Sequence, residues 1–128
     1  MTIAVKICGL TSAAAVDAAA DAGAAYGGLV FHRRSPRFVA PEAARALAGH
    51  MRGRLKIVAL VADMDDAELE AVVERVHPDY LQLHGAEDVA RTAAIRARFG
   101  LPVIKALAVA ESADLAAAFE FEKVADML

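Results

Sequence analysis

The chain has 128 residues, the size of one ordinary domain, so we expect residues 1–128 to form a single domain with one core. Its hydrophobic fraction of 58% includes 32 alanines, which leaves a share of larger apolar side chains that is ordinary for a soluble protein. The formal net charge of −3, without a basic stripe, argues against nucleic acid as a partner.

The single cysteine, Cys8, excludes an intrachain disulfide, and the four scattered histidines argue against a structural zinc site, so no metal is expected. Charged residues such as Lys6 and Lys105 interrupt the most apolar stretches. No segment therefore reaches the roughly 18 uncharged residues of a membrane-spanning helix. Lys6 also breaks the N-terminal apolar run, which argues against a secretory leader. These features predict a cytoplasmic protein that has no membrane partner.

Short runs rich in branched aliphatic residues recur along the chain, and each is followed by a longer stretch with helical spacing. The strands are nearly continuously apolar, as expected of parallel strands that helices cover on at least one face. This pattern predicts an α/β protein built from βα repeats. The predicted strands are residues 3–8, 27–31, 55–61, 79–83, 102–107 and 124–128.

Capping residues mark several of the helices between these strands. Ser12 is expected as the N-cap of the first helix and Gly23 as its end, while Pro41 suits the first turn of the second. Asp65 is expected to cap a helix over residues 66–76. The apolar stripe of that helix consists of Leu69, Val72, Val73 and Val76.

The predicted strands start about 24 residues apart, close to the minimum for one βα unit. Eight such units would need about 194 residues, just under the low end of known eightfold barrels. The chain therefore contains strands 1 to 6 and helices 1 to 5, and Leu128 lies within an apolar run without a turn signal. We expect a truncated or partly represented barrel. An open sheet with five helices is the alternative.

In a βα barrel, functional groups gather at the carboxyl ends of the strands. Charged or reactive groups follow four predicted strands, at residues 6–9, at residues 32–37, at Asp63 and at residues 84–85. Alternation along a strand places Lys6 and Cys8 on one face of the first strand, and Gln82 and His84 on one face of the fourth. We therefore expect these four side chains to converge near the carboxyl-terminal side of the sheet.

Each of these candidate residues has a functional and a structural interpretation. Cys8 is either a small buried hydrophobe or, as a thiolate, a general base or nucleophile, with Lys6 and His84 as cations that favour the thiolate. Lys6 alternatively neutralises a buried carboxylate, and His84 alternatively has a structural role. Arg37 lies in an arginine-rich loop that suits solvent, but its guanidinium can also clamp a carboxylate with two hydrogen bonds.

Other polar residues favour structural roles. Helix capping is the commoner explanation for Asp63, which precedes Asp65 and Asp66. His50 is expected to complement a helix dipole, and His77 to form a turn before the fourth strand. The sequence has no Gly-rich phosphate loop of the Walker or dinucleotide type, so a phosphate site is expected beyond Leu128.

Four sequence runs, in order and at consistent spacing over the whole chain, resemble the phosphoribosylanthranilate isomerase family. They are Val5-Lys6-Ile7-Cys8-Gly9-Leu10-Thr11, Gly28-Leu29-Val30-Phe31-His32 with Ser35-Pro36-Arg37, Leu81-Gln82-Leu83-His84-Gly85, and Val103-Ile104-Lys105-Ala106. The resemblance implies a parallel (βα)8 TIM barrel. It also implies an Amadori rearrangement of a small phosphorylated substrate in tryptophan biosynthesis, without a metal or organic cofactor.

By the same resemblance, Cys8 matches the catalytic base and Arg37 the residue that binds the anthranilate carboxylate. His84 would line the substrate site, and we group Lys6 with the substrate-binding residues. The family's general acid, an aspartate at the end of strand six, would follow Leu128 and is not Asp126. The phosphate-binding loops would also come later. We therefore expect a polypeptide that truly ends at residue 128 to be inactive alone and to self-associate through unpaired strand edges.

Two other functions remain as alternatives. A receiver-like, doubly wound signalling domain fits the length, with Asp63 after the third strand and Lys105 in the fifth. It lacks the acidic pair that such domains need after the first strand, where this chain has Lys6 and Cys8. A folded but non-catalytic barrel fragment is the second alternative. The sequence leaves the oligomeric state open, with a homodimer among the possibilities.

Overall fold

The computed structural model describes residues 2–128, which form a parallel sheet flanked by helices. The strands are β1 (Lys6–Cys8), β2 (Tyr26–Val30), β3 (Lys56–Val61), β4 (Tyr80–Leu83) and β5 (Val103–Lys105). The helices are α1 (Ala13–Asp21), α2 (Pro41–Met51), α3 (Asp66–Val76), α4 (Val89–Phe99) and α5 (Leu115–Phe121), the last preceded by the short 3₁₀ turn Ser112–Asp114. The predicted α/β class and the alternation of strands and helices are confirmed.

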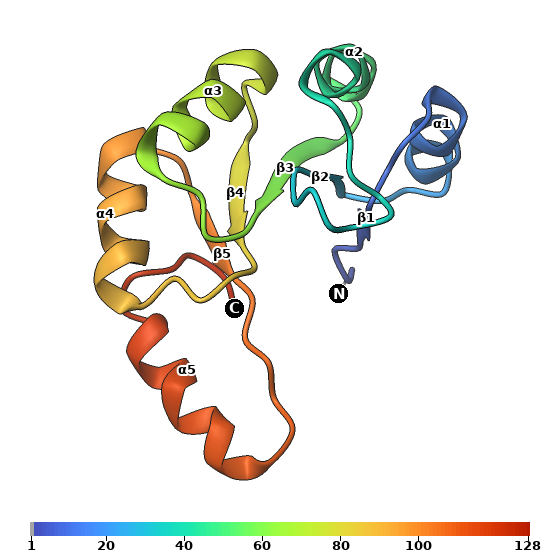
Figure 1. Ribbon diagram of the computed structural model, residues 1–128. Coiled ribbons are helices and arrows are strands. Elements are labelled where there is room, and N and C mark those ends of the chain that lie inside the picture. The colour runs from blue at the N-terminus through green and yellow to red at the C-terminus, as the bar shows by residue number, and fades with distance from the viewer. Residues whose placement is uncertain (1) are drawn as a thin grey trace.

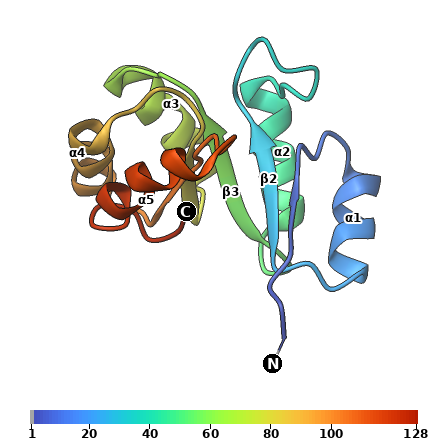
Figure 2. The ribbon, with the colours of Figure 1, turned by 90° about the horizontal axis from the view of Figure 1, so that it is seen from below.

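The five strands lie in the order β1-β2-β3-β4-β5, and every neighbouring pair is parallel. Figure 1 shows the sheet as an arc, with α1 to α4 along its outer side. Figure 2 shows α1 at one end of this row of helices, and α4 and α5 at the other. A sequential order is that of a barrel wall, whereas a doubly wound sheet reverses its order at a switch point. The receiver-like alternative is therefore wrong.

The two faces of the sheet carry different side chains because successive residues of a strand point to opposite sides. On the outer face, Leu29, Ile57 and Leu81 are fully buried in one cluster with the apolar sides of the helices. On the inner face, Cys8, Gly28, Val58 and Tyr80 form one row across four strands. Alternation then places Lys6, Gln82 and His84 on the same inner face, as the sequence predicts.

Local signals place several helix ends where the sequence predicts them. The Ser12 side chain accepts a hydrogen bond from the Ala15 N–H at 3.1 Å, and α1 ends just before Gly23, whose φ is +81°. Asp65 and Glu68 form a reciprocal capping box that starts α3. Between residues 2 and 128, the structure contains no helix with the length and apolar character needed to span a membrane.

The predicted sixth strand is only partly present: no regular strand spans residues 124–128, although residues 126 and 127 are hydrogen-bonded beside β5. Hydrogen bonds from the N–H groups of Val124 and Ala125 to the Phe121 carbonyl continue the helical turn at the end of α5. Only the last few residues are then extended beside β5, where Met127 forms a single parallel bridge with Ile104. The first predicted strand is also shorter, since β1 starts at Lys6 and Ile3 remains 86% exposed.

Candidate active site

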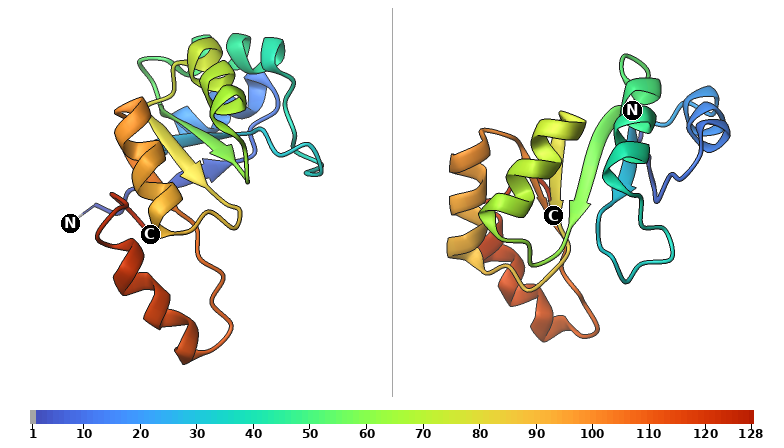
Figure 3. Two further views of the ribbon diagram at one scale, coloured as in Figure 1. Left: turned by 60° about the vertical axis from the view of Figure 1, so that its left-hand side comes forward. Right: turned by 45° about the horizontal axis from the view of Figure 1, so that its top comes forward.

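A cavity of about 290 Å³ opens at the carboxyl ends of β2, β3 and β4. In the right view of Figure 3, β2 and β3 point toward the end where the connection between β2 and α2 projects. The cavity therefore lies at the end of the sheet where a parallel barrel places its chemistry. Its lining residues are Val30, His32, Ser35, Arg37, Leu60, Ala62, Asp63, His84 and Gly85.

Arg37 connects the β2–α2 loop to the end of β1. The loop is folded locally, because the Ser35 hydroxyl accepts a hydrogen bond from the Arg37 N–H at 3.1 Å. The Arg37 guanidinium donates to the Cys8 carbonyl at 3.2 Å, and its side chain lies across Gly9. A Cβ atom on Gly9 would come within 2.4 Å of the Arg37 Cδ, so this close approach requires glycine.

Cys8 and Lys6 lie together on the inner face of β1, over the neighbouring strand. A Cβ atom on Gly28 would lie 3.2 Å from the Cys8 Sγ and 3.4 Å from the Lys6 Cε. The glycine thus leaves space for both side chains, and Cys8 is a free, partly exposed cysteine. Neither Cys8 nor Lys6 lines the 290 Å³ cavity itself. Cys8 is linked to the cavity through its carbonyl contact with Arg37.

His84 follows β4 directly and lines the cavity with Asp63 and Arg37. Its N–H donates to the Val61 carbonyl at 2.9 Å, which continues the pairing of β4 with β3 for one more residue. Two of the predicted site residues, Arg37 and His84, therefore share one cavity although they are far apart in the sequence. The imidazole and the guanidinium can together bind an anionic ligand.

Helix capping is wrong for Asp63, because Asp65 caps α3. Asp63 has a left-handed backbone with φ 52°, and its carboxylate accepts a hydrogen bond from the Ala86 N–H at 2.7 Å. A Cβ atom on Gly85 would lie 2.6 Å from this carboxylate, so the two loops are in tight contact. Asp63 thus lines the cavity, and its carboxylate also holds the loop after His84.

The sequence placed residues 32–37 and Asp63 at strand ends, but His32, Ser35 and Asp63 were not selected as site residues. His32 could have been selected, because it lies two positions after Val30 and so continues the inner face of β2 past the strand end. Asp63 was assigned to helix capping instead, since its contact with a loop more than 20 residues away cannot be read from a local pattern. Residues 2–128 contain no group of three His, Cys, Asp or Glu side chains that could hold a metal ion.

Below the cavity, Tyr26 and Tyr80 meet on the inner face with ring centroids 5.5 Å apart and ring planes at 82°. Burial, and in second place the neighbouring Tyr26, raises the pKa of the Tyr80 phenol. The phenol therefore stays neutral at physiological pH. This edge-to-face pair fills the inner face nearer the amino ends of the strands.

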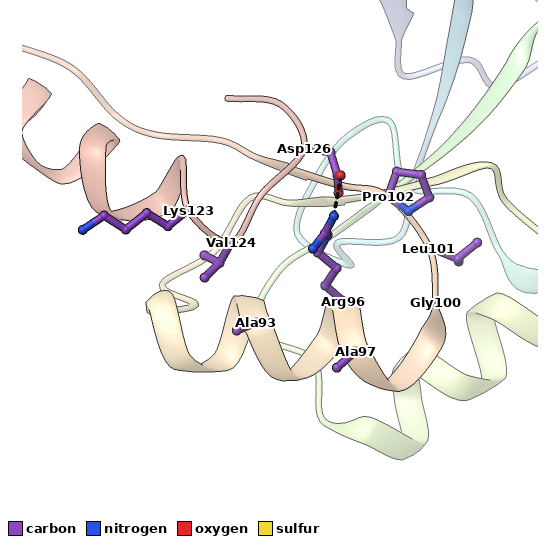
Figure 4. A pocket seen from close by; sticks show the side chains of 9 residues that line it. All are labelled: Ala93, Arg96, Ala97, Gly100, Leu101, Pro102, Lys123, Val124 and Asp126. Atoms are coloured by element: carbon purple, nitrogen blue, oxygen red, sulfur yellow. Dashed lines mark hydrogen bonds and ion pairs between the residues drawn. The ribbon is translucent and has the colours of Figure 1, made fainter.

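A second hollow, of about 430 Å³, lies between α4 and the C-terminal segment, at the amino end of β5 (Figure 4). There the Arg96 guanidinium donates two hydrogen bonds to Asp126, at 2.9 and 2.8 Å, and the Val103 N–H donates a third at 2.9 Å. These donors lower the pKa of the Asp126 carboxyl, chiefly through Arg96. Asp126 is thus bound to structural partners, at the opposite end of β5 from the carboxyl ends of the strands.

The chain was compared with known proteins. The family described as N-(5'-phosphoribosyl)anthranilate (PRA) isomerase matches residues 5–128. Over all 128 residues, the chain is 52% identical to the N-(5'-phosphoribosyl)anthranilate isomerase of Bradyrhizobium sp. (strain ORS 278), of which it covers 58%. It is 51% identical to that of Paracoccus denitrificans, of which it covers 60%. The chain thus spans about three fifths of the length of these curated relatives.

Among solved structures, the phosphoribosyl anthranilate isomerase of Thermotoga maritima superposes with a TM-score of 0.89 at 28% identity. The match covers 95% of this chain and 58% of that protein, so the described sheet corresponds to part of a TIM barrel. Since the family match extends over nearly the whole sequence, the chain belongs to the N-(5'-phosphoribosyl)anthranilate isomerase family.

Proposed function

We propose that the protein containing this chain catalyses the Amadori rearrangement of N-(5-phosphoribosyl)anthranilate to 1-(2-carboxyphenylamino)-1-deoxyribulose 5-phosphate, a step of tryptophan biosynthesis. The observation that carries this proposal is the position of Arg37, which lines the same cavity as His84 and donates a hydrogen bond to the Cys8 carbonyl. The Arg37 guanidinium therefore places a group that can bind a carboxylate next to the residue that carries the thiol. A similar structure, with a TM-score of 0.89, is in complex with reduced 1-(o-carboxyphenylamino)-1-deoxyribulose 5-phosphate, which supports the same ligand class.

The reaction moves protons without net oxidation. A proton delivered to the ribose ring oxygen breaks the C1–O bond and leaves an iminium at C1, which acidifies the proton on C2. Removal of that proton gives an enolamine, and tautomerisation of the enolamine gives the C2 ketone and the C1 amine. We assign the C2 proton to Cys8 as the thiolate base, because a thiolate is a competent general base.

The other residues have binding roles in this scheme. Arg37 holds the anthranilate carboxylate with two parallel hydrogen bonds, and His84 lines the same cavity. Lys6 lies beside Cys8 on the inner face of β1 and belongs with the substrate-binding residues. By family resemblance, the general acid and the phosphate-binding loops belong to positions that follow Leu128 in the complete protein. Neither a metal nor an organic cofactor takes part.

The organisation of the complete protein is part of the same proposal. Residues 1–128 supply the first part of a single TIM-barrel domain in a cytoplasmic enzyme. One structural relative, with a TM-score of 0.87, is described as generated monomers of a dimeric phosphoribosylanthranilate isomerase, which supports a homodimer here. The substrate is a small phosphorylated molecule, with neither nucleic acid nor a membrane as partner.

The test replaces Cys8 and Arg37 in the complete natural protein and follows turnover by the fluorescence of the anthranilate group. Cys8→Ala should lower kcat by about a hundredfold or more with little change in KM, because it removes the base. Arg37→Ala should chiefly raise KM. Arg98→Ala is the matched control, since Arg98 pairs with Asp66 and Glu70 on the outer helices. Full turnover by the Cys8 variant would require another base.

A further inference from the structure

Glu87 and Lys105 form an ion pair that the proposed reaction does not use. Among residues 2–128 they are the two ionisable residues that are buried, and each side chain is only 3% exposed. The Lys105 Nζ lies 3.2 Å from the Glu87 Oε1. Lys105 is paired in register with Leu83, so its side chain points to the outer face of the sheet, away from the cavity. It also lies 5.5 Å from the centre of the Phe121 ring.

The pair holds the two loops that form one wall of the cavity. The Glu87 carboxylate accepts hydrogen bonds from the Gly85 N–H at 2.9 Å and, through its other oxygen, from the Asp63 N–H at 2.7 Å. Lys105 donates to the Gly85 carbonyl at 2.9 Å. The Gly85 residue is thus held at both its N–H and its C=O. The pair also holds the N–H of Asp63, whose left-handed backbone is unfavourable for a non-glycine residue.

Stability alone does not explain two buried charges at this place. Removing a carboxylate and an ammonium from water is costly, and well-packed apolar side chains of similar size are often as stable as a buried ion pair. An apolar pair, however, has no acceptors for the Asp63 and Gly85 amides and no donor for the Gly85 carbonyl. The charged pair therefore supplies hydrogen bonds that set the course of the two loops.

We propose that Glu87 and Lys105 are a positioning pair, which fixes the Gly85 backbone and Asp63 from behind the sheet so that His84 and Asp63 line the substrate cavity. Because Gly85 directly follows His84 and touches the Asp63 carboxylate, a shift of this backbone moves both cavity residues. The effect on substrate rests on the proposed function, whereas the effect on the loop does not.

The main test is the double variant Glu87→Gln/Lys105→Met in the complete natural protein, because it leaves no unpaired buried charge. A glutamine has one oxygen, so it cannot accept both the Asp63 and the Gly85 amides as Glu87 does, and methionine cannot donate to the Gly85 carbonyl. We expect a folded protein with a moderately lower Tm, because one amide and the Gly85 carbonyl lose their partners. The NMR shifts of the Asp63 and Gly85 amides and of the His84 ring should also change. KM for N-(5-phosphoribosyl)anthranilate should rise about tenfold to a hundredfold, with a smaller change in kcat.

The control is Glu120→Gln/Lys123→Met, which neutralises an exposed pair of the same residue types on and after α5. It should change neither the shifts nor KM. A double variant of the buried pair with unaltered shifts and KM would show that the pair is only structural, and would overturn the proposal. If the unmodified protein did not turn over the substrate, the proposed function would fail, and the amide and His84 shifts would still decide the positioning role.

A measurement on the unmodified protein tests the same proposal if the variants do not fold. The Asp63 and Gly85 amides lie in loops, yet their hydrogen bonds to a buried carboxylate should make their hydrogen exchange as slow as that of β4. Exchange as fast as that of an exposed loop would contradict the positioning role.

Discussion

At the scale of single residues, close backbone approach decides where the candidate site residues lie. Gly9 follows Cys8 with φ +79°, and the Arg37 side chain fills the space where a Cβ atom would be. The absence of a side chain at this one position therefore serves both the turn after β1 and the contact between Arg37 and the Cys8 carbonyl. The segment after Cys8 is thus specified by backbone conformation and by crowding together.

A comparison of Gly9→Ala with Gly23→Ala should separate the effect of the left-handed backbone from the effect of crowding by Arg37. Gly23 has a similar φ of +81°, but no atom lies within 4 Å of its hypothetical Cβ. Gly23→Ala should cost only the strain of a left-handed alanine, about 1–2 kcal/mol of unfolding free energy. Gly9→Ala should cost more and should also displace Arg37, raising the KM for the anthranilate substrate. Equal effects of the two variants on stability and KM would contradict the inference that contact with the Arg37 side chain requires a glycine at position 9.

At the scale of elements, one carboxylate anchors the C-terminal segment to the sheet. Asp126 joins Arg96 of α4 to the first residue of β5, and the Lys105 N–H donates to the Met127 carbonyl at 2.9 Å farther along. The pKa of Asp126 is lowered in the folded state, so the folded protein favours the ionised form more than the unfolded chain does. This stabilisation is complete above the ordinary carboxyl pKa of about 3.9 and is lost as the pH falls through the lowered value.

Asp126→Asn should lower the unfolding free energy at pH 7 by about 1–2 kcal/mol, because it removes a charged partner of Arg96. The difference from the unmodified protein should shrink as the pH falls from about 4 through the lowered pKa of Asp126, below which the folded protein also protonates this carboxyl. The Lys105 amide should exchange faster in the variant. Asp66→Asn is the control, since Asp66 is paired with Arg91 between α3 and α4 and also has a lowered pKa. It should leave exchange at Lys105 unchanged.

At the scale of the whole molecule, the curved sheet has an outer face packed against helices and an inner face that carries the candidate site residues Cys8 and His84. The outer cluster takes Leu81 and Leu83 from β4 together with apolar residues of the helices. Buried apolar area is the main favourable contribution to folding, so stability resides on this outer side. The polar residues that line the cavity at the strand ends are exposed or half-buried, and they contribute less to the folding of the sheet.

Leu81→Ala on the outer face should lower the unfolding free energy by about 2–5 kcal/mol, because Leu81 is completely buried. Ile3→Ala, at a residue that is 86% exposed, should change it by less than about 0.5 kcal/mol. Urea unfolding followed by circular dichroism measures both values, since the chain has no tryptophan to report by fluorescence. A small cost for Leu81→Ala would argue against a stabilising outer layer.

The sequence alone determined the βα repeat, most helix ends and the face on which Cys8 and His84 lie, because these depend on periodicity and on caps within a few residues. Only the tertiary structure decided that pairing with β5 is limited to residues 126 and 127, and that Asp63 lines the cavity and does not cap a helix. It alone brought Arg37 to Cys8 and paired Glu87 with Lys105. These outcomes depend on contacts between loops and strands far apart in the chain, which local patterns do not encode.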